Sequence, residues 1–358
     1  MAKKEAASQE KQVIEKKLVT PIDGPYLQYQ NKRLLDFSSQ DFLGLSQHPD
    51  IKKSAIKYTL RLGVGTLSPV FESLPQKQIE EKLAQLLGSE KAILFNSFSE
   101  ATSYLFNVIA SSDSVVFSDG PLNISQPHHP FSSLGGLQNL LAKTKLSSSA
   151  THIIYVSSSS FDLKTLSALA KESHAIVCFN DAEHFGISGK RGLGFGAGQK
   201  NIDCVMASLE HACGCPAAYI AGSHTLLKER PSISPLIPSV LGALDAVLNV
   251  FPDMDAERSQ IEQHTSWLHS QLQEKGFALP PSKTPKITLT FSSAEDAERL
   301  WNFFIDNDIM LEYVEPKKVS LNMTALHTPD DLDQLSTVLK KLSDTDFALA
   351  IQSSTPTP

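Results

Sequence analysis

Short apolar runs alternate with helix-patterned segments along most of the chain. The runs are four to seven residues long, carry few charges, and are separated by segments whose apolar residues recur at helical spacing. Continuous apolar runs of this length are typical of strands buried on both faces, as in a parallel sheet covered by helices. The alternation therefore predicts an α/β fold with a mainly parallel sheet. The runs are KAILF (91–95), SVVFSD (114–119), HIIYVS (152–157), AIVCFND (175–181), CVMASL (204–209) and AAYIAGS (217–223).

The same pattern suggests where the chain divides. A long, mostly helical stretch follows the last apolar run, and beyond it the order strand, helix, strand, strand, helix indicates a compact α+β unit. The start of the chain is highly charged, and its end, QSSTPTP, has nothing apolar to bury. We therefore expect an N-terminal segment (1–35), a large domain (36–245), a small C-terminal α+β domain (246–343) and a flexible tail (344–358).

Composition excludes several classes of protein. The 32 Lys and Arg against 39 Asp and Glu give a net charge of −7, which argues against a nucleic-acid partner. The first residues are too charged for a signal peptide, and no stretch approaches the roughly 18 apolar residues of a membrane span. Four cysteines without zinc-type spacing predict neither a disulfide framework nor a metal site. We expect a soluble, cytoplasmic protein.

Five segments of the chain carry recognisable motifs in a fixed order. They are SQDFLGL (39–45) with HP (48–49); GVG (63–65) with IE (79–80); NDA (180–182) with glycines 186, 189, 192 and 194; SLEHACG (208–214) with YIAGS (219–223); and TALHT (324–328) with DDL (330–332). Together they resemble the α-oxoamine synthases, a family of pyridoxal-phosphate (PLP) dependent transferases of fold type I that includes 8-amino-7-oxononanoate synthase and serine palmitoyltransferase. The likeness spans about residues 35 to 342.

The resemblance implies more than the pattern alone does. It implies a three-layer PLP-transferase fold with a large domain around a mainly parallel sheet and a small α+β C-terminal domain. It also implies a dimer with PLP bound at the subunit interface. The implied reaction joins an amino acid to an acyl-CoA with loss of carbon dioxide, as in 8-amino-7-oxononanoate synthase.

Several residues depart from what that chemistry requires. A lysine amine must hold the cofactor aldehyde as a Schiff base, and His211 stands at the matching position. A carboxylate should keep the pyridine nitrogen protonated, and Asn180 stands there. Glu183 replaces a histidine near the cofactor's ring oxygen. These residues and Ser208 would line a degenerate cofactor pocket.

Other losses lie around the same pocket. The glycine-containing pair that opens a helix beside the cofactor phosphate is Phe98-Ser99, and an arginine that would clamp the substrate carboxylate aligns near Ser320. We therefore predict that covalent PLP binding is absent. The leading hypothesis is a catalytically impaired homologue that acts as a binding or scaffolding subunit, in a homodimer or in a heterodimer with an active paralogue.

Three alternatives stay open, one of them a homodimeric protein that binds an unrelated ligand in the old pocket. A shift of one residue would give Asp181 and His184 the family's D-x-x-H spacing and restore both partners of the cofactor, although no lysine. The chain would then be an active acyl-CoA:amino acid acyltransferase, or an enzyme that uses PLP or its amine form noncovalently, with His211 as the base. The sequence does not identify the substrate.

Overall fold

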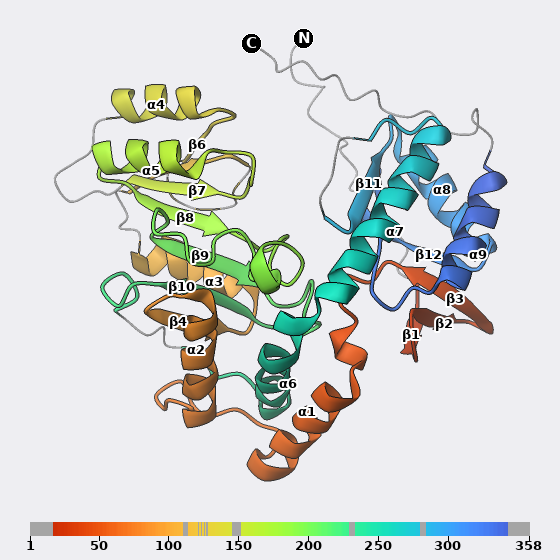
Figure 1. Ribbon diagram of the computed structural model, residues 1–358, viewed down its shortest axis with the longest axis horizontal. Helices are drawn as coiled ribbons and strands as arrows, with labels where there is room; N and C mark the ends of the chain where they lie inside the picture. The colour runs from red at the N-terminus through yellow and green to blue at the C-terminus, as the bar shows by residue number, and fades with distance from the viewer. Residues whose placement is uncertain are drawn as a thin grey trace, which may run out of the picture. The chain divides into compact units, whose positions relative to one another are not determined.

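The computed structural model describes residues 17–109, 114–120, 122, 124, 126, 128–144, 152–228, 233–279 and 284–342. The described residues form two compact units (Figure 1). One unit is built from a continuous stretch, residues 40–259, and the other combines residues before 40 with residues after 259. The predicted flexible tail (344–358) lies outside the described residues.

The continuous unit is organised around a seven-stranded sheet of order β4-β10-β9-β8-β7-β5-β6. Neighbours from β9 through β8, β7 and β5 to β6 are parallel, whereas β10 is antiparallel to both β9 and β4. The mainly parallel sheet predicted from the apolar runs is confirmed. Its strands are β4 (Lys91–Phe95), β5 (Val115–Ser118), β6 (His128–Pro130), β7 (His152–Val156), β8 (Ile176–Asn180), β9 (Cys204–Ser208) and β10 (Ala218–Gly222).

Helices cover both faces of this sheet. Ile153 and Tyr155 of β7 belong to one buried cluster, which includes residues of α3 (Phe98–Tyr104) and of the π-helical turn Leu105–Ile109 that follows it. Ile154 and Val156 point the other way, into a cluster with α4 (Leu134–Lys143) and α5 (Leu163–Glu172). Because alternate residues of one strand face opposite sides, the arrangement has three layers. In Figure 1, α4 and α5 lie together beside β6 and β7.

The remaining helices of this unit are α1 (Pro49–Leu62), α2 (Leu74–Leu87) and α6 (Pro238–Val250). α1 and α6 pack closely because Gly242 of α6 has no side chain, and a Cβ there would overlap the backbone carbonyl of Ser54. Short 3-10 turns occur at Leu45–Gln47, Lys190–Gly192 and Phe251–Asp253. α7 (Asp255–Glu274) begins in this unit and continues into the second one.

The second unit contains a six-stranded sheet of order β1-β2-β3-β12-β13-β11. Its core includes Leu35 of β3, Leu311 of β12 and Leu321 of β13, and α8 and α9 contribute Phe304 and Leu335. The expected small α+β domain is present. The elements are β1 (Val19–Ile22), β2 (Tyr26–Tyr29), β3 (Lys32–Phe37), β11 (Lys286–Thr290), α8 (Ala294–Asp306), β12 (Ile309–Glu315), β13 (Lys318–Asn322) and α9 (Pro329–Lys340).

The units divide the chain at other points than the expected boundaries 35/36 and 245/246. β3 pairs in parallel with β12, with Leu35 opposite Ile309, so part of the N-terminal segment is built into the second unit. The boundary expected at 245 falls inside α6, which packs against α1 within the continuous unit. Among the described residues, no helix has both the length and the apolar character needed to cross a membrane.

Candidate functional site

Four strands end at one edge of the continuous unit's sheet. β5, β7, β8 and β9 are parallel, so their carboxyl ends lie side by side. In open α/β sheets this edge is where ligands bind. The side chains placed there by the strand ends are Asp119, Ser157, Asn180 and Ser208.

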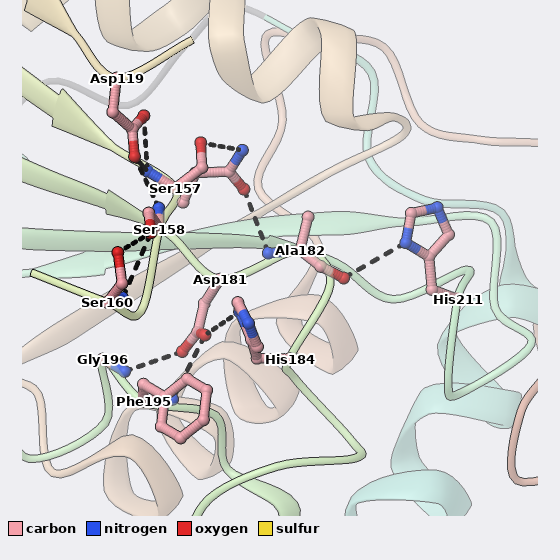
Figure 2. Close-up of polar contacts among 11 residues, drawn as sticks. Asp119, Ser157, Ser158, Ser160, Asp181, Ala182, His184, Phe195, Gly196 and His211 are labelled. Carbon is pink, nitrogen blue, oxygen red and sulfur yellow. Dashed lines mark hydrogen bonds and ion pairs between the residues drawn. The ribbon is translucent and has the colours of Figure 1, made fainter. Parts of the chain in front are cut away.

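The Asp119 carboxylate ties two of these strand ends together. It accepts hydrogen bonds from the backbone N–H of Ser157 at 2.9 and 3.0 Å and from that of Ser158 at 2.6 Å (Figure 2). Ser158 also contacts Ser160, with 2.6 Å between their hydroxyl oxygens. The carboxylate therefore fixes the turn after β7 and is saturated by the chain's own donors. Sequence reasoning did not assign Asp119 a role.

Asn180, the last residue of β8, is half-buried and bonded to its neighbours. Its Nδ2 donates to the Ser157 hydroxyl at 3.4 Å, and its Oδ1 accepts from the backbone N–H of Ala182 at 3.1 Å. Next to it, burial raises the pKa of the Tyr155 phenol well above its usual range. The amide carries no charge, so this strand end offers no anion to a protonated ring nitrogen.

Asp181 follows Asn180 but lies in a different environment. Its side chain is fully buried, and its carboxylate accepts the backbone N–H of Gly196 at 2.8 Å and that of Phe195 at 3.2 Å. Gly194 passes so close that a Cβ there would overlap the Asp181 carboxylate. The glycine-rich loop thus folds around this aspartate, which explains why glycine stands at position 194.

His184 accompanies Asp181, whereas Glu183 does not. The Nδ1 of His184 is 3.4 Å from Asp181 Oδ1, and its buried ring meets Phe195 edge-on at 4.7 Å between centroids. Figure 2 shows Asp181, His184, Phe195 and Gly196 grouped together. Glu183 is exposed to solvent. Asp181 and His184, the pair that a shift of one residue would make the cofactor's partners, therefore lie close together. Their contacts, however, are with the glycine-rich loop.

His211 lies in the turn between β9 and β10 and is half-buried. Its Nδ1 is 3.2 Å from the carbonyl oxygen of Ala182 (Figure 2). A carbonyl can only accept, so Nδ1 carries the proton and Nε2 has the free lone pair. The His211 carbonyl accepts the N–H of Phe42 at 2.9 Å, which joins the first and fourth sequence motifs.

The residues around His211 shape its turn, and no lysine lies close to it in sequence. Ser208 is buried, and its hydroxyl accepts the backbone N–H of Glu210 at 3.2 Å, which shapes the turn that leads to His211. Lys200 and Lys228, the closest lysines in sequence, are both exposed. Burial raises the pKa of the Cys213 thiol well above its usual range and that of Cys215 to about 12, so both remain protonated at neutral pH.

The glycine-rich loop is also fixed from its other side. Arg258, at the start of α7, donates from Nε to the carbonyl of Gly186 at 2.8 Å and from a second nitrogen to the carbonyl of Arg191 at 3.1 Å. A Cβ at Gly192 would overlap the Arg258 guanidinium. Arg258 is thus a structural partner of the loop, which nothing in the local sequence pattern signals.

The first turn of α3 contains a carboxylate, that of Glu100. Glu100 accepts from the backbone N–H of Asn96 at 2.8 Å and from the Asn96 side-chain amide at 3.2 Å. The Ser97 hydroxyl accepts the N–H of Glu100 at 3.1 Å and caps the helix. Within the described part of the chain, no cluster of three or more His, Cys, Asp or Glu side chains could hold a metal ion.

Comparison with known proteins gives a consistent pattern. No family profile matches the chain. An 8-amino-7-oxononanoate synthase from Gluconacetobacter diazotrophicus is 27% identical over 369 residues, which cover 91% of this chain and 92% of that one. The enzyme of the same name from Cellvibrio japonicus is 26% identical over 360 residues, covering 91% and 90%.

Solved structures show the same fold. A serine palmitoyltransferase from S. paucimobilis superposes with a TM-score of 0.80 at 17% identity, covering 90% of this chain and 91% of its own. That structure is a variant with one lysine replaced by alanine, and it holds a PLP–myriocin aldimine. The 8-amino-7-oxononanoate synthase of Francisella tularensis superposes with a TM-score of 0.70 at 20% identity, covering 86% and 97%.

Proposed function

Because the chain belongs to the α-oxoamine synthase family of PLP-dependent transferases, we propose that it has kept the family's fold and lost its covalent catalysis. In this proposal it acts as a binding or scaffolding subunit in the cytoplasm. The observation that carries the proposal is His211, an imidazole at the position where the family has its Schiff-base lysine. An imidazole has no primary amine and cannot form that imine.

The residues around Asn180 support the same conclusion. Its amide is bonded to Ser157 and Ala182, and it cannot supply the negative charge that keeps a pyridine nitrogen protonated. The neighbouring Asp181 is buried in the glycine-rich loop, where each of its carboxylate oxygens accepts one backbone N–H. The donor set at this sheet edge therefore does not fit PLP held and activated in the family's manner, and we derive no reaction step through it.

An apolar surface supports the role of a subunit. Between the end of α1 and the start of α2, Val64, Val70 and Phe71 are 82%, 80% and 62% exposed. Beside them a cavity of about 320 Å³ is lined largely by leucine and proline side chains, among them Leu62 and Pro238. Exposed apolar residues concentrated in one short segment of the chain are typical of protein–protein interfaces. We propose that this face pairs with a second α-oxoamine-synthase-like chain, either a copy or an active paralogue.

The test of lost covalent catalysis is direct. The purified protein is incubated with PLP, its absorbance is followed for an internal-aldimine band, and borohydride reduction with peptide mapping then detects any lysine-bound cofactor. We expect neither band nor label. The family's lysine-bearing 8-amino-7-oxononanoate synthase is the positive control. A labelled lysine peptide would contradict the proposal.

The partner is tested by mass in solution. Light scattering of the protein alone, and of the protein co-expressed with a lysine-bearing paralogue, separates the two kinds of dimer. Val70→Asp and Phe71→Asp should weaken whichever dimer forms, because each places a charge in an apolar interface. A monomer in both preparations would remove the support for a subunit role.

One observation favours a second candidate function. The hydrogen bond from His211 Nδ1 to Ala182 fixes the tautomer and leaves Nε2 free, which is the arrangement of a general base. In this case the chain would use PLP or pyridoxamine phosphate noncovalently; the serine palmitoyltransferase variant with one lysine replaced by alanine, which holds a PLP–myriocin aldimine, is compatible with it. Turnover of alanine and an acyl-CoA that disappears in His211→Ala would establish this function and overturn the first.

A further inference from the structure

We propose that Glu100 is a tethered anion that closes the phosphate end of the former cofactor pocket, so that this chain discriminates against phosphorylated ligands. The inference deepens the proposed function, because it concerns the same pocket, but it depends on neither His211 nor Asn180. It adds a residue that determines which ligands the pocket accepts.

The turn between β4 and α3 holds the Glu100 carboxylate in place. β4 ends at Phe95 and α3 begins at Phe98, so only Asn96 and Ser97 join them. Glu100 Oε2 accepts two hydrogen bonds from Asn96, one from its backbone and one from its side chain. The Asn96 side chain also donates to the carbonyl of Ser234 at 2.9 Å, which fixes it to the segment before α6.

The negative charge of Glu100 opposes the binding of a phosphate. A helix start attracts anions, because its first N–H groups point outward and the positive end of the helix dipole lies there. In this chain the attraction acts on the carboxylate of Glu100, in the first turn of the helix. The resemblance to the family places the cofactor phosphate beside Phe98-Ser99, which is next to Glu100 in the chain. A phosphate dianion there would therefore meet a like charge.

The bulk of Phe98 opposes a phosphate as well. Phe98 replaces the glycine at the start of this helix, and its ring packs, partly buried, against the cluster that contains Phe95 and Tyr104. A side chain here prevents the close approach of ligand to backbone that glycine allows. Charge and bulk thus act together, and both oppose a phosphate while leaving the uncharged part of a ligand unaffected.

The experiment compares PLP with pyridoxal, which lacks the phosphate, together with inorganic phosphate as a competitor. Dissociation constants are measured by calorimetry on the full chain. We expect wild type to bind PLP no more tightly than pyridoxal. Glu100→Gln should raise the preference for PLP by at least about tenfold, because it removes the like charge and keeps the shape of the side chain. Adding Phe98→Gly should raise it further.

Two controls isolate the charge of Glu100. Glu81→Gln removes one negative charge from an exposed position on α2 and should leave the preference unchanged. Glu100→Asp keeps the charge and should also behave as wild type. If Glu100→Gln fails to fold, the comparison of PLP with pyridoxal in the wild type still tests the inference. A wild type that prefers PLP tenfold or more, or a Glu100→Gln variant that folds and has an unchanged preference, would overturn the inference.

The two proposals can fail separately. A borohydride-trapped lysine in wild type without a preference for PLP over pyridoxal would contradict only the loss of covalent catalysis. A strong phosphate preference without any trapped lysine would contradict only the role of Glu100.

Discussion

Asp181 accepts the backbone N–H of Gly196 at 2.8 Å, so the one carboxylate directly beside Asn180 is bonded to the glycine-rich loop. The two residues are adjacent in sequence and serve different parts of the structure. Asn180 ends a strand at the edge where ligands bind in such sheets, and Asp181 turns into the protein interior. This relationship decides what each substitution at these positions should change.

We expect Asp181→Asn to destabilise the protein by about 2–4 kcal/mol, because each carboxylate oxygen accepts one backbone N–H, and the amide would accept only one of the two and place its NH2 group against the other. Urea unfolding measures the change. Glu183→Gln, at an exposed position, should stay within about 0.5 kcal/mol. If Asp181→Asn instead kept its stability and lost affinity for PLP, Asp181 would be the cofactor's partner and the one-residue shift would be correct.

The glycine-rich loop allows a matched pair of substitutions. Gly194 and Gly198 both have positive φ, +80° and +69°, so alanine strains the backbone at either position. A Cβ at Gly194 would also overlap the Asp181 carboxylate, whereas the space beside Gly198 is open. We expect Gly198→Ala to cost about 1 kcal/mol and Gly194→Ala at least about 3 kcal/mol in thermal unfolding. Equal losses would show that the contact with Asp181 is unimportant.

His327 should make the stability of the second unit depend on pH. Its ring is buried and stacks on Phe37 at 4.2 Å. Nδ1 accepts the N–H of Thr324 at 3.0 Å, and Nε2 is 3.0 Å from the carbonyl of Asp36, to which it must donate. Burial lowers the pKa of His327 to about 4. A second proton would place a positive charge in this buried site and break the hydrogen bond that Nδ1 accepts from the Thr324 N–H.

The sign follows from the two pKa values. Between pH about 6.5 and about 4 the unfolded chain takes up a proton on this histidine and the folded chain does not, so stability falls as the pH falls, by up to about 3 kcal/mol. Both tryptophans, Trp267 and Trp301, belong to this unit, and their fluorescence reports its unfolding. His327→Gln should flatten the dependence in that window. An unchanged slope in this variant would contradict the assignment.

The effects of two neighbouring groups, His264 and Asp36, on the pH dependence must be distinguished from that of His327. Burial also lowers the pKa of His264, which adds to the loss of stability in acid, so His264→Gln is measured in parallel. Burial raises the pKa of the Asp36 carboxyl, which has the opposite effect, since that contribution to stability is lost as the pH rises. We expect the slope to fall more in His327→Gln than in His264→Gln.

Restoring the missing groups should restore the covalent cofactor. His211→Lys supplies a primary amine at the motif position, and Asn180→Asp supplies the carboxylate. We expect a borohydride-trapped lysine at position 211 in the double variant and none in Asn180→Asp alone. Glu100→Gln added to the double variant should strengthen PLP binding. Failure of the folded double variant to form an imine would show that losses elsewhere in the pocket also prevent it.

Much of the continuous unit could be predicted from its sequence, because its strands are local apolar runs. All six runs became strands, and the alternation with helices gave the three layers. The direction of β10 could not be predicted, since a buried strand has the same composition whether its neighbours are parallel or antiparallel. The strands before residue 38 were missed, because β1 and β2 have only four residues each, and β3 carries three charged residues and pairs with the distant β12.

The site residues could be predicted only in part. The motif fixed the neighbourhood of His211, and the structure places it against Ala182. The choice between Asn180 and Asp181 depended on which side chain turns inward, and this is decided by the backbone donors of Phe195 and Gly196. Asp119 and Glu100 gave no signal, because their partners are backbone N–H groups, which every sequence contains.

The parallel pairing of β3 with β12 has a consequence for biosynthesis. The partner of Leu35 is Ile309, so the sheet of the second unit cannot close until residue 309 has left the ribosome. Residues 40–259 emerge as one uninterrupted stretch before that moment and contain all strands of their own sheet. The nascent chain should therefore complete its larger unit first and must keep residues 19–37 unpaired with β12 until residues 309–315 have been synthesised.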